Sequence, residues 1–109
     1  MISIEDFRKI DIIVGQILSV EKVPDTDKLL NLSVDLGEEK PRQIVSGIAL
    51  YYEDIQTLVG RKCMFVANLE SRVIRGLESQ GMIFALSTED DKFSLISPLE
   101  DMPVGTKAR

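Results

Sequence analysis

Apolar and polar residues alternate along most of this chain, which is the pattern of half-buried β-strands. The alternation is cleanest where Leu30, Leu32, Val34 and Leu36 share one face and polar residues occupy the other. The apolar run at residues 63–67 instead predicts a strand buried on both faces. The predicted strands span residues 12–23, 30–36, 43–48, 61–69, 82–86 and 93–96. The last two are expected to pair as a hairpin.

Two segments instead predict helical structure. Ser3 is a good N-cap for a short helix that reaches residue 10, with Ile2 and Phe7 placed as a hydrophobic staple. Residues 51–58 predict a short helix or helical turn. Gly15, inside the first strand, predicts a bulge or a sharp bend. The tail from residue 98 contains two prolines and a glycine, so we expect it to be extended and docked.

This order of elements predicts an all-β fold. Five or more short strands, with one helical insert between the third and fourth, indicate a small barrel. The oligonucleotide/oligosaccharide-binding (OB) fold has that strand count and a helix in that place. No linker or repeat divides the chain. We therefore expect one domain over residues 1–109, a five-stranded OB-fold barrel with a short N-terminal helix and a C-terminal extension.

Composition argues against catalysis. The chain has no histidine and a single cysteine, Cys63, which removes histidine-based catalysis, disulfides within the chain and the usual zinc sites. It contains no phosphate-binding or dinucleotide-binding glycine motif, so no cofactor or metal is expected. Asp25 and Asp27 are best interpreted as turn residues. No run approaches the ~18 apolar residues of a membrane span, and the acidic N-terminus lacks a signal-like apolar region. We expect a cytoplasmic binding protein.

The charge distribution qualifies the acidic net charge of −5. Residues 1–39 hold 4 basic and 9 acidic residues, residues 40–81 hold 6 and 4, and residues 82–109 hold 3 and 5. Only the middle segment is positive. A protein can bind RNA when its basic residues gather on one face, because the local field and counterion release decide affinity.

Basic and small polar residues fall where an OB-fold takes its ligand, across one sheet face and the loops after strands 1 and 4. Any one of them is more often an ordinary surface residue, so the signal is their joint occurrence. Few aromatic residues remain for base stacking, which favours structured RNA recognised by its backbone and 2′-hydroxyls. The candidates from position alone are Lys22, Lys28, Arg42, Gln43, Arg72, Arg75, Ser79 and Gln80.

Several collinear motifs extend this interpretation. They are Ile4–Phe7, Lys9–Asp11, Val14–Gly15, Asp27–Leu30, Val34–Gly37, Arg42–Ile48, Val66–Leu69 and Glu78–Met82. Over its whole length the chain resembles the tRNA-binding domain found at the C-terminus of methionyl-tRNA synthetase, as a separate beta subunit, and in small structure-specific tRNA-binding proteins. Glu70-Ser71, where that family often has a basic residue and proline, and the apolar pair Ile12-Ile13, where it often has an arginine, depart from the pattern.

The resemblance implies a non-catalytic barrel that binds the outer corner of tRNA by its shape and raises a synthetase's affinity for it. It implies a homodimer formed through the N-terminal helix and the C-terminal tail, and association with the catalytic region of methionyl-tRNA synthetase. The tRNA-binding residues it implies are Lys28, Arg42, Ser79 and Met82, with Arg72 and Arg75 where the family is basic. Two alternatives stay open: an export-related chaperone of the same fold that binds unfolded polypeptides, and a module that only scaffolds a synthetase complex.

Overall fold

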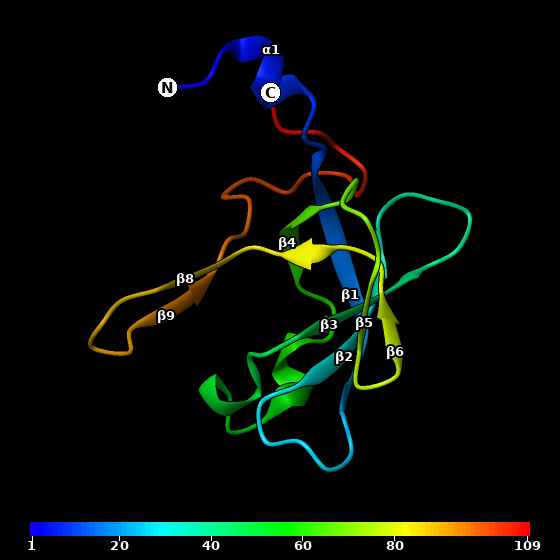
Figure 1. Cartoon of the computed structure of the whole chain (residues 1–109), viewed down its shortest axis with the longest axis vertical. Coiled ribbons are helices and arrows are strands. Elements are labelled where there is room, and N and C mark those ends of the chain that lie inside the picture. Colours follow the sequence, from blue (N-terminus) through cyan, green and yellow to red (C-terminus); the bar gives the residue numbers. More distant parts are fainter.

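A computed structural model describes all residues, 1–109, and its centre is a nearly closed five-stranded antiparallel barrel with the strand order β3-β2-β1-β4-β7 (Figure 1). Two separate two-stranded hairpins, β5–β6 and β8–β9, extend from it. The predicted all-β barrel with a short N-terminal helix is confirmed. The elements are α1 (Ile4–Arg8), β1 (Ile12–Lys22), β2 (Leu30–Asp35), β3 (Arg42–Ser46), η1 (Ala49–Tyr51), η2 (Ile55–Leu58), β4 (Lys62–Val66), β5 (Arg72–Ile74), β6 (Leu77–Ser79), β7 (Met82–Ile83), β8 (Ala85–Ser87) and β9 (Phe93–Leu95), where η marks a 3₁₀ helix.

The barrel is filled by the apolar residues that the alternation predicted. Leu30, Leu32 and Val34 of β2 are fully buried, while the residues between them are half-exposed. Phe65 of β4 and Ile17 of β1 are also fully buried in the same cluster. Burying large side chains such as these supplies the main favourable term in folding, at about 1.5–3 kcal/mol each.

Core packing, and not a β-bulge, explains the glycine at position 15. A Cβ at this position would lie 2.7 Å from side-chain carbons of both Leu36 and Phe65. The register shift in β1 comes later, between Ile17 and Ser19, in the part of the strand that pairs with β2. The predicted bulge at Gly15 is therefore wrong in position. The glycine is required because the core leaves no room for a side chain.

Other predicted elements change in extent. Residues 82–86 do not form one strand, because the strand is interrupted at Phe84. Before this residue β7 pairs with β4, and after it β8 pairs with β9 as the predicted hairpin. The strand predicted over 61–69 ends at Val66. The insert predicted over 51–58 consists of two 3₁₀ turns, η1 and η2, rather than an α-helix.

Both chain ends lie at the same end of the barrel (Figure 1). Ser3 caps α1 as predicted, accepting a hydrogen bond from the Asp6 amide at 3.1 Å, but α1 buries none of its residues and Ile2 of the predicted staple is 70% exposed. The tail docks beside β1 as expected. The Ala108 amide donates to Ile12 at 2.7 Å, and Lys107 pairs with Asp11 at 2.7 Å. No helix is long and apolar enough to cross a membrane.

Candidate nucleic-acid interface

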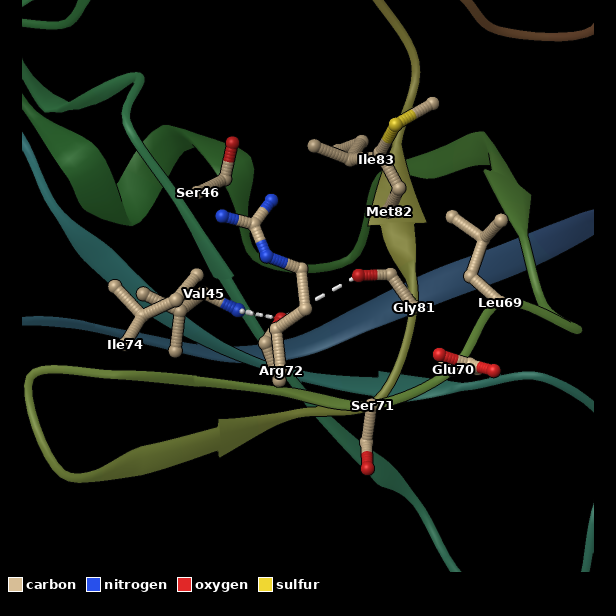
Figure 2. A pocket seen from close by; sticks show the side chains of 11 residues that line it. Val45, Ser46, Leu69, Glu70, Ser71, Arg72, Ile74, Gly81, Met82 and Ile83 are labelled. Atoms are coloured by element: carbon tan, nitrogen blue, oxygen red, sulfur yellow. Dashed lines mark hydrogen bonds between the residues drawn. The ribbon is translucent and has the colours of Figure 1, made fainter.

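An open groove runs between strand β3, strand β7 and the β5–β6 hairpin (Figure 2). Its volume is about 480 Å³. The hairpin lies in the stretch after β4 that the sequence treated as a polar binding loop, so this loop carries two short strands of its own. The groove thus lies where an OB-fold takes its ligand. The lining residues are Val45, Ser46, Leu69, Glu70, Ser71, Arg72, Ile74, Ser79, Gly81, Met82 and Ile83.

A two-residue turn, Arg75-Gly76, forms the tip of the hairpin. Ile74 pairs with Leu77, and both turn residues have positive φ, 53° and 78°. Such turns match the right-handed twist of a hairpin, and they favour Asn-Gly or Asp-Gly because other side chains are strained there. Arginine is therefore an unfavourable choice for folding alone. It places a cation at the outermost point of the hairpin.

Three of the six sequence-predicted binding residues are cations free of internal partners. The side chains of Lys28, Arg72 and Arg75 are exposed and make no hydrogen bond or ion pair within the chain. Figure 2 shows the Arg72 guanidinium extending into the groove toward Ser46. Lys28 lies off this groove, in a hollow beside Gly47 that is discussed below. These cations need no rearrangement to meet phosphate oxygens.

Ser79 occupies the floor of the groove with only 5% of its surface exposed. Its hydroxyl accepts a hydrogen bond from the Val45 amide at 3.0 Å and lies 3.4 Å from the Gly81 carbonyl, to which it donates. Both hydrogen bonds are drawn in Figure 2. The hydroxyl proposed as an RNA contact is thus already engaged in joining β3 to the segment before β7.

Arg42 is likewise engaged within the protein. Its guanidinium forms a bidentate pair with Glu38, at 2.8 Å for each bond, and also donates to the carbonyls of Ala67 and Gln80. Four of its five N–H donors are therefore used. The hydrogen bonds and the adjacent charge of Arg42 lower the pKa of Glu38, while the same pair raises the pKa of Arg42. Little of this guanidinium remains for a phosphate.

Together these residues close the barrel. Strands β3 and β7 share no backbone ladder, and the gap is bridged by side-chain hydrogen bonds together with one backbone hydrogen bond. The Gln80 side chain accepts from the Gln43 amide at 3.1 Å, and the Gln80 amide donates to the Gln43 carbonyl at 2.8 Å. We call Arg42, Gln43, Ser79 and Gln80 the closure cluster. Sequence reasoning placed all four among the ligand contacts and missed this structural task.

The groove also has an apolar side. Met82 and Leu69 are 44% and 50% exposed, and Ile74 lies opposite them across the groove. Glu70 lies on the rim below Leu69 (Figure 2), so its carboxylate offsets the charge of Arg72 in the same groove. The site therefore offers one interior cation, an apolar wall and a second cation at the hairpin tip. Ile12 and Ile13, the apolar pair that departs from the family pattern, are half-buried, and Ile13 packs against the core.

Cys63 takes no part in this surface. It is fully buried in β4, and burial raises the pKa of its thiol. Its sulfur lies 3.7 Å from the Ser97 hydroxyl, a hydrogen bond that partly opposes the shift. A protonated, enclosed thiol behaves as a small apolar residue.

Comparison with known proteins agrees with the resemblance that the sequence motifs indicated. A family model described as "Putative tRNA binding domain" matches residues 12–107. The chain is 47% identical over 109 residues to the methionine–tRNA ligase of Deinococcus radiodurans, covering 100% of this chain and 16% of that enzyme. The chain thus spans a small part of that ligase.

Solved structures extend the likeness to short proteins. The methionyl-tRNA synthetase-related protein of Pyrococcus horikoshii superposes with a TM-score of 0.91 at 38% identity, covering 100% of this chain and 98% of that one. The chaperone CsaA of Bacillus anthracis gives a TM-score of 0.87 at 26% identity, covering 100% and 99%. On the strength of the family match over most of its length, this chain belongs to the tRNA-binding domain family.

Proposed function

We propose that this chain binds folded tRNA by its shape, through the groove and the tip of the β5–β6 hairpin, and carries out no chemistry of its own. The observation that supports this best is the pair Arg72 and Arg75. Both guanidinium groups are free, one inside the groove and one at a turn where arginine is conformationally unfavourable. Unusual backbone at an exposed cation is more readily explained by binding than by folding.

The remaining candidate residues fall into two groups, those that would contact RNA and those that would support the site. Met82 lines the groove and offers apolar contact to ribose or base, and Lys28 extends the cationic surface. Ser79 and Arg42 act by holding β3 against the hairpin, so we propose that they support the site rather than contact RNA. In this role the domain raises the tRNA affinity of a methionyl-tRNA synthetase, either joined to its catalytic region or as a separate chain.

The test replaces the two arginines without disturbing the fold. Arg72→Gln keeps a long polar side chain, and Arg75→Asn supplies a residue that tolerates positive φ. We expect the double variant to weaken tRNA binding and to lower the slope of log K against log salt by about 0.7–0.9 for each lost phosphate contact. Lys40→Gln is the control, since Lys40 is an exposed, unpaired cation in the β2–β3 turn that lines neither the groove nor the proposed dimer surface. Equal affinity and slope for the double variant and the control would exclude this interface.

A second candidate function is supported by the apolar wall of the groove. Leu69, Met82 and the hairpin residue Val73, 76% exposed, offer contacts to apolar side chains, and the similar CsaA protein is described as a chaperone. Titration with folded tRNA, heat-unfolded tRNA and an unfolded polypeptide at physiological salt separates the two. Preference for folded tRNA supports the first function; suppression of aggregation without tRNA affinity supports the second.

We also propose that the chain forms a homodimer through its N-terminal helix and C-terminal tail. Met1, Ile2, Ile4 and Leu99 are all more than half exposed, an apolar set that a monomer leaves in water. The tail cannot simply be deleted, because it hydrogen-bonds to β1. Ile4→Glu is the better test: it alters no buried residue and should shift the mass measured by light scattering from dimer to monomer. A monomeric parent chain would exclude the dimer.

A further inference from the structure

A second hollow lies on the surface next to the groove. It has a volume of about 610 Å³ and is lined by Lys28, Gly47, Leu50, Tyr51 and Asp91. The groove ends on Val45 and Ser46, and the next residue of the same segment, Gly47, begins this hollow. The two pockets therefore adjoin at the end of β3.

The wall of this hollow is an aromatic ring that is already part of a stack. The rings of Tyr51 and Phe93 lie parallel, with centroids 4.0 Å apart and planes 8° apart. Tyr52 meets Phe93 edge-on at 6.0 Å, which fixes the pair from the side. Phe93 lines a neighbouring hollow, which Tyr51 and Asp91 share, but it does not line this one. The other face of Tyr51, whose residue is 42% exposed, is thus free to accept a third ring.

Two unpaired charges accompany this ring. Lys28 is positioned beside η1 because its carbonyl accepts a hydrogen bond from the Ala49 amide at 2.9 Å, while its ammonium group makes no hydrogen bond or ion pair. Asp91 sits in a turn with φ 64°, and its carboxylate is also without a hydrogen bond or ion pair. A free ammonium suits a phosphate. A free carboxylate suits the N–H groups of a base edge or a ribose hydroxyl.

We infer that Tyr51 is a stacking platform for one exposed nucleobase of the bound RNA, with Lys28 at a neighbouring phosphate and Asp91 at the base edge or the 2′-hydroxyl. This inference rests on the proposed function and extends its footprint beyond the groove. It also changes the expectation from sequence, in which too few aromatic residues seemed available for stacking. The platform is assembled from η1 and β9, which are far apart along the chain.

Tyr51 can be tested by variants that separate stacking from folding. Tyr51→Leu removes the ring and should weaken binding of folded tRNA by at least about fivefold, the lower limit for loss of one stacked base. Tyr51→Phe keeps the ring and should retain binding within about twofold, which distinguishes stacking from a hydroxyl contact. Lys28→Gln should lower the salt slope by about 0.7–0.9, whereas Lys40→Gln, at an exposed unpaired lysine in the β2–β3 turn, should not.

A fluorescent reporter gives an independent readout, because the chain contains no tryptophan. Tyr51→Trp places a single indole at the platform, and folded tRNA should quench its emission at a concentration that matches the measured affinity. Val59→Trp is the matched control: Val59 has the same 42% exposure and lines neither the hollow nor the groove, so its emission should barely change.

The outcomes distinguish this inference from the proposed function. If Arg72→Gln with Arg75→Asn weakens tRNA binding while Tyr51→Leu binds normally and Tyr51→Trp is not quenched, the platform is wrong and the groove stands. If the parent chain shows no salt-dependent tRNA binding, both the proposed function and the stacking platform are wrong. If only an unfolded polypeptide quenches Tyr51→Trp, the surface takes a protein ligand and the inference is overturned.

Discussion

Replacing Ser79 by alanine tests whether this residue closes the barrel or contacts RNA. The change removes the acceptor for the Val45 amide, which belongs to a residue only 7% exposed. Leaving a buried donor unsatisfied costs about 1–3 kcal/mol. Because Ser79 lines an open groove, water can reach this amide in part, so we expect the lower part of the range, about 1–2 kcal/mol. At about 4–8 °C per kcal/mol for a domain of this size, Tm should fall by about 4–16 °C.

The measurement is urea unfolding at pH 7, supported by calorimetry and by tRNA titration below the transition. Ser87→Ala is the control, since Ser87 is exposed on β8 and makes no hydrogen bond; its free energy of unfolding should stay within about 0.5 kcal/mol of the parent chain. The tRNA affinity of folded Ser79→Ala should change by less than about threefold. A large loss of tRNA affinity at unchanged stability would refute the structural role and restore Ser79 as a contact.

Three further predictions follow from named contacts. Arg42 lowers the pKa of Glu38, so this carboxylate stabilises the fold above its ordinary pKa of 4.5 and loses that effect as the pH falls through its lower folded value. The Glu38→Gln variant should therefore be less stable than the parent chain at pH 7. In acid, the free energies of unfolding of the two proteins should converge. Gly15→Ala forces a methyl against Phe65 and should lower the free energy of unfolding in urea by about 1–3 kcal/mol; an unchanged value would contradict this packing argument. Glu70→Gln removes the anion from the groove rim and should strengthen tRNA binding at low salt, an effect that should fade as salt is raised.

The alternation of apolar and polar residues was sufficient to predict the barrel. Strands β1 and β2 lie where the pattern placed them; β2 buries one face with a period of two, whereas in β1 the alternation is interrupted at the register shift between Ile17 and Ser19. The split at Phe84 escaped prediction because an unbroken apolar run does not show where a strand changes partners. The β5–β6 hairpin escaped because Arg-Gly is not a usual hairpin turn, and its strands are too short and too exposed to alternate clearly.

The sequence named candidate residues for the site but did not show which of them are engaged within the fold and which are free. Arg42 and Arg72 are chemically the same side chain, and nothing local separates a guanidinium that joins three chain segments from one that points into an open groove. The difference arises from Glu38, Ala67 and Gln80, which converge on Arg42 only after the barrel forms. The pairing of Tyr51 with Phe93 is likewise a product of tertiary packing that no local pattern indicates.

The position of the two chain ends bears on how such a domain can be combined with other proteins. Residues 107 and 108 lie beside residues 11–13, so both ends leave the barrel together, whereas the hairpin tip and η1 lie toward the other end of the molecule (Figure 1). A partner domain fused to either end would start at the same place, with its linker directed away from the Arg75 tip and Tyr51. The barrel can therefore be placed before or after a partner domain as a unit, with the proposed RNA-binding surface still pointing outward.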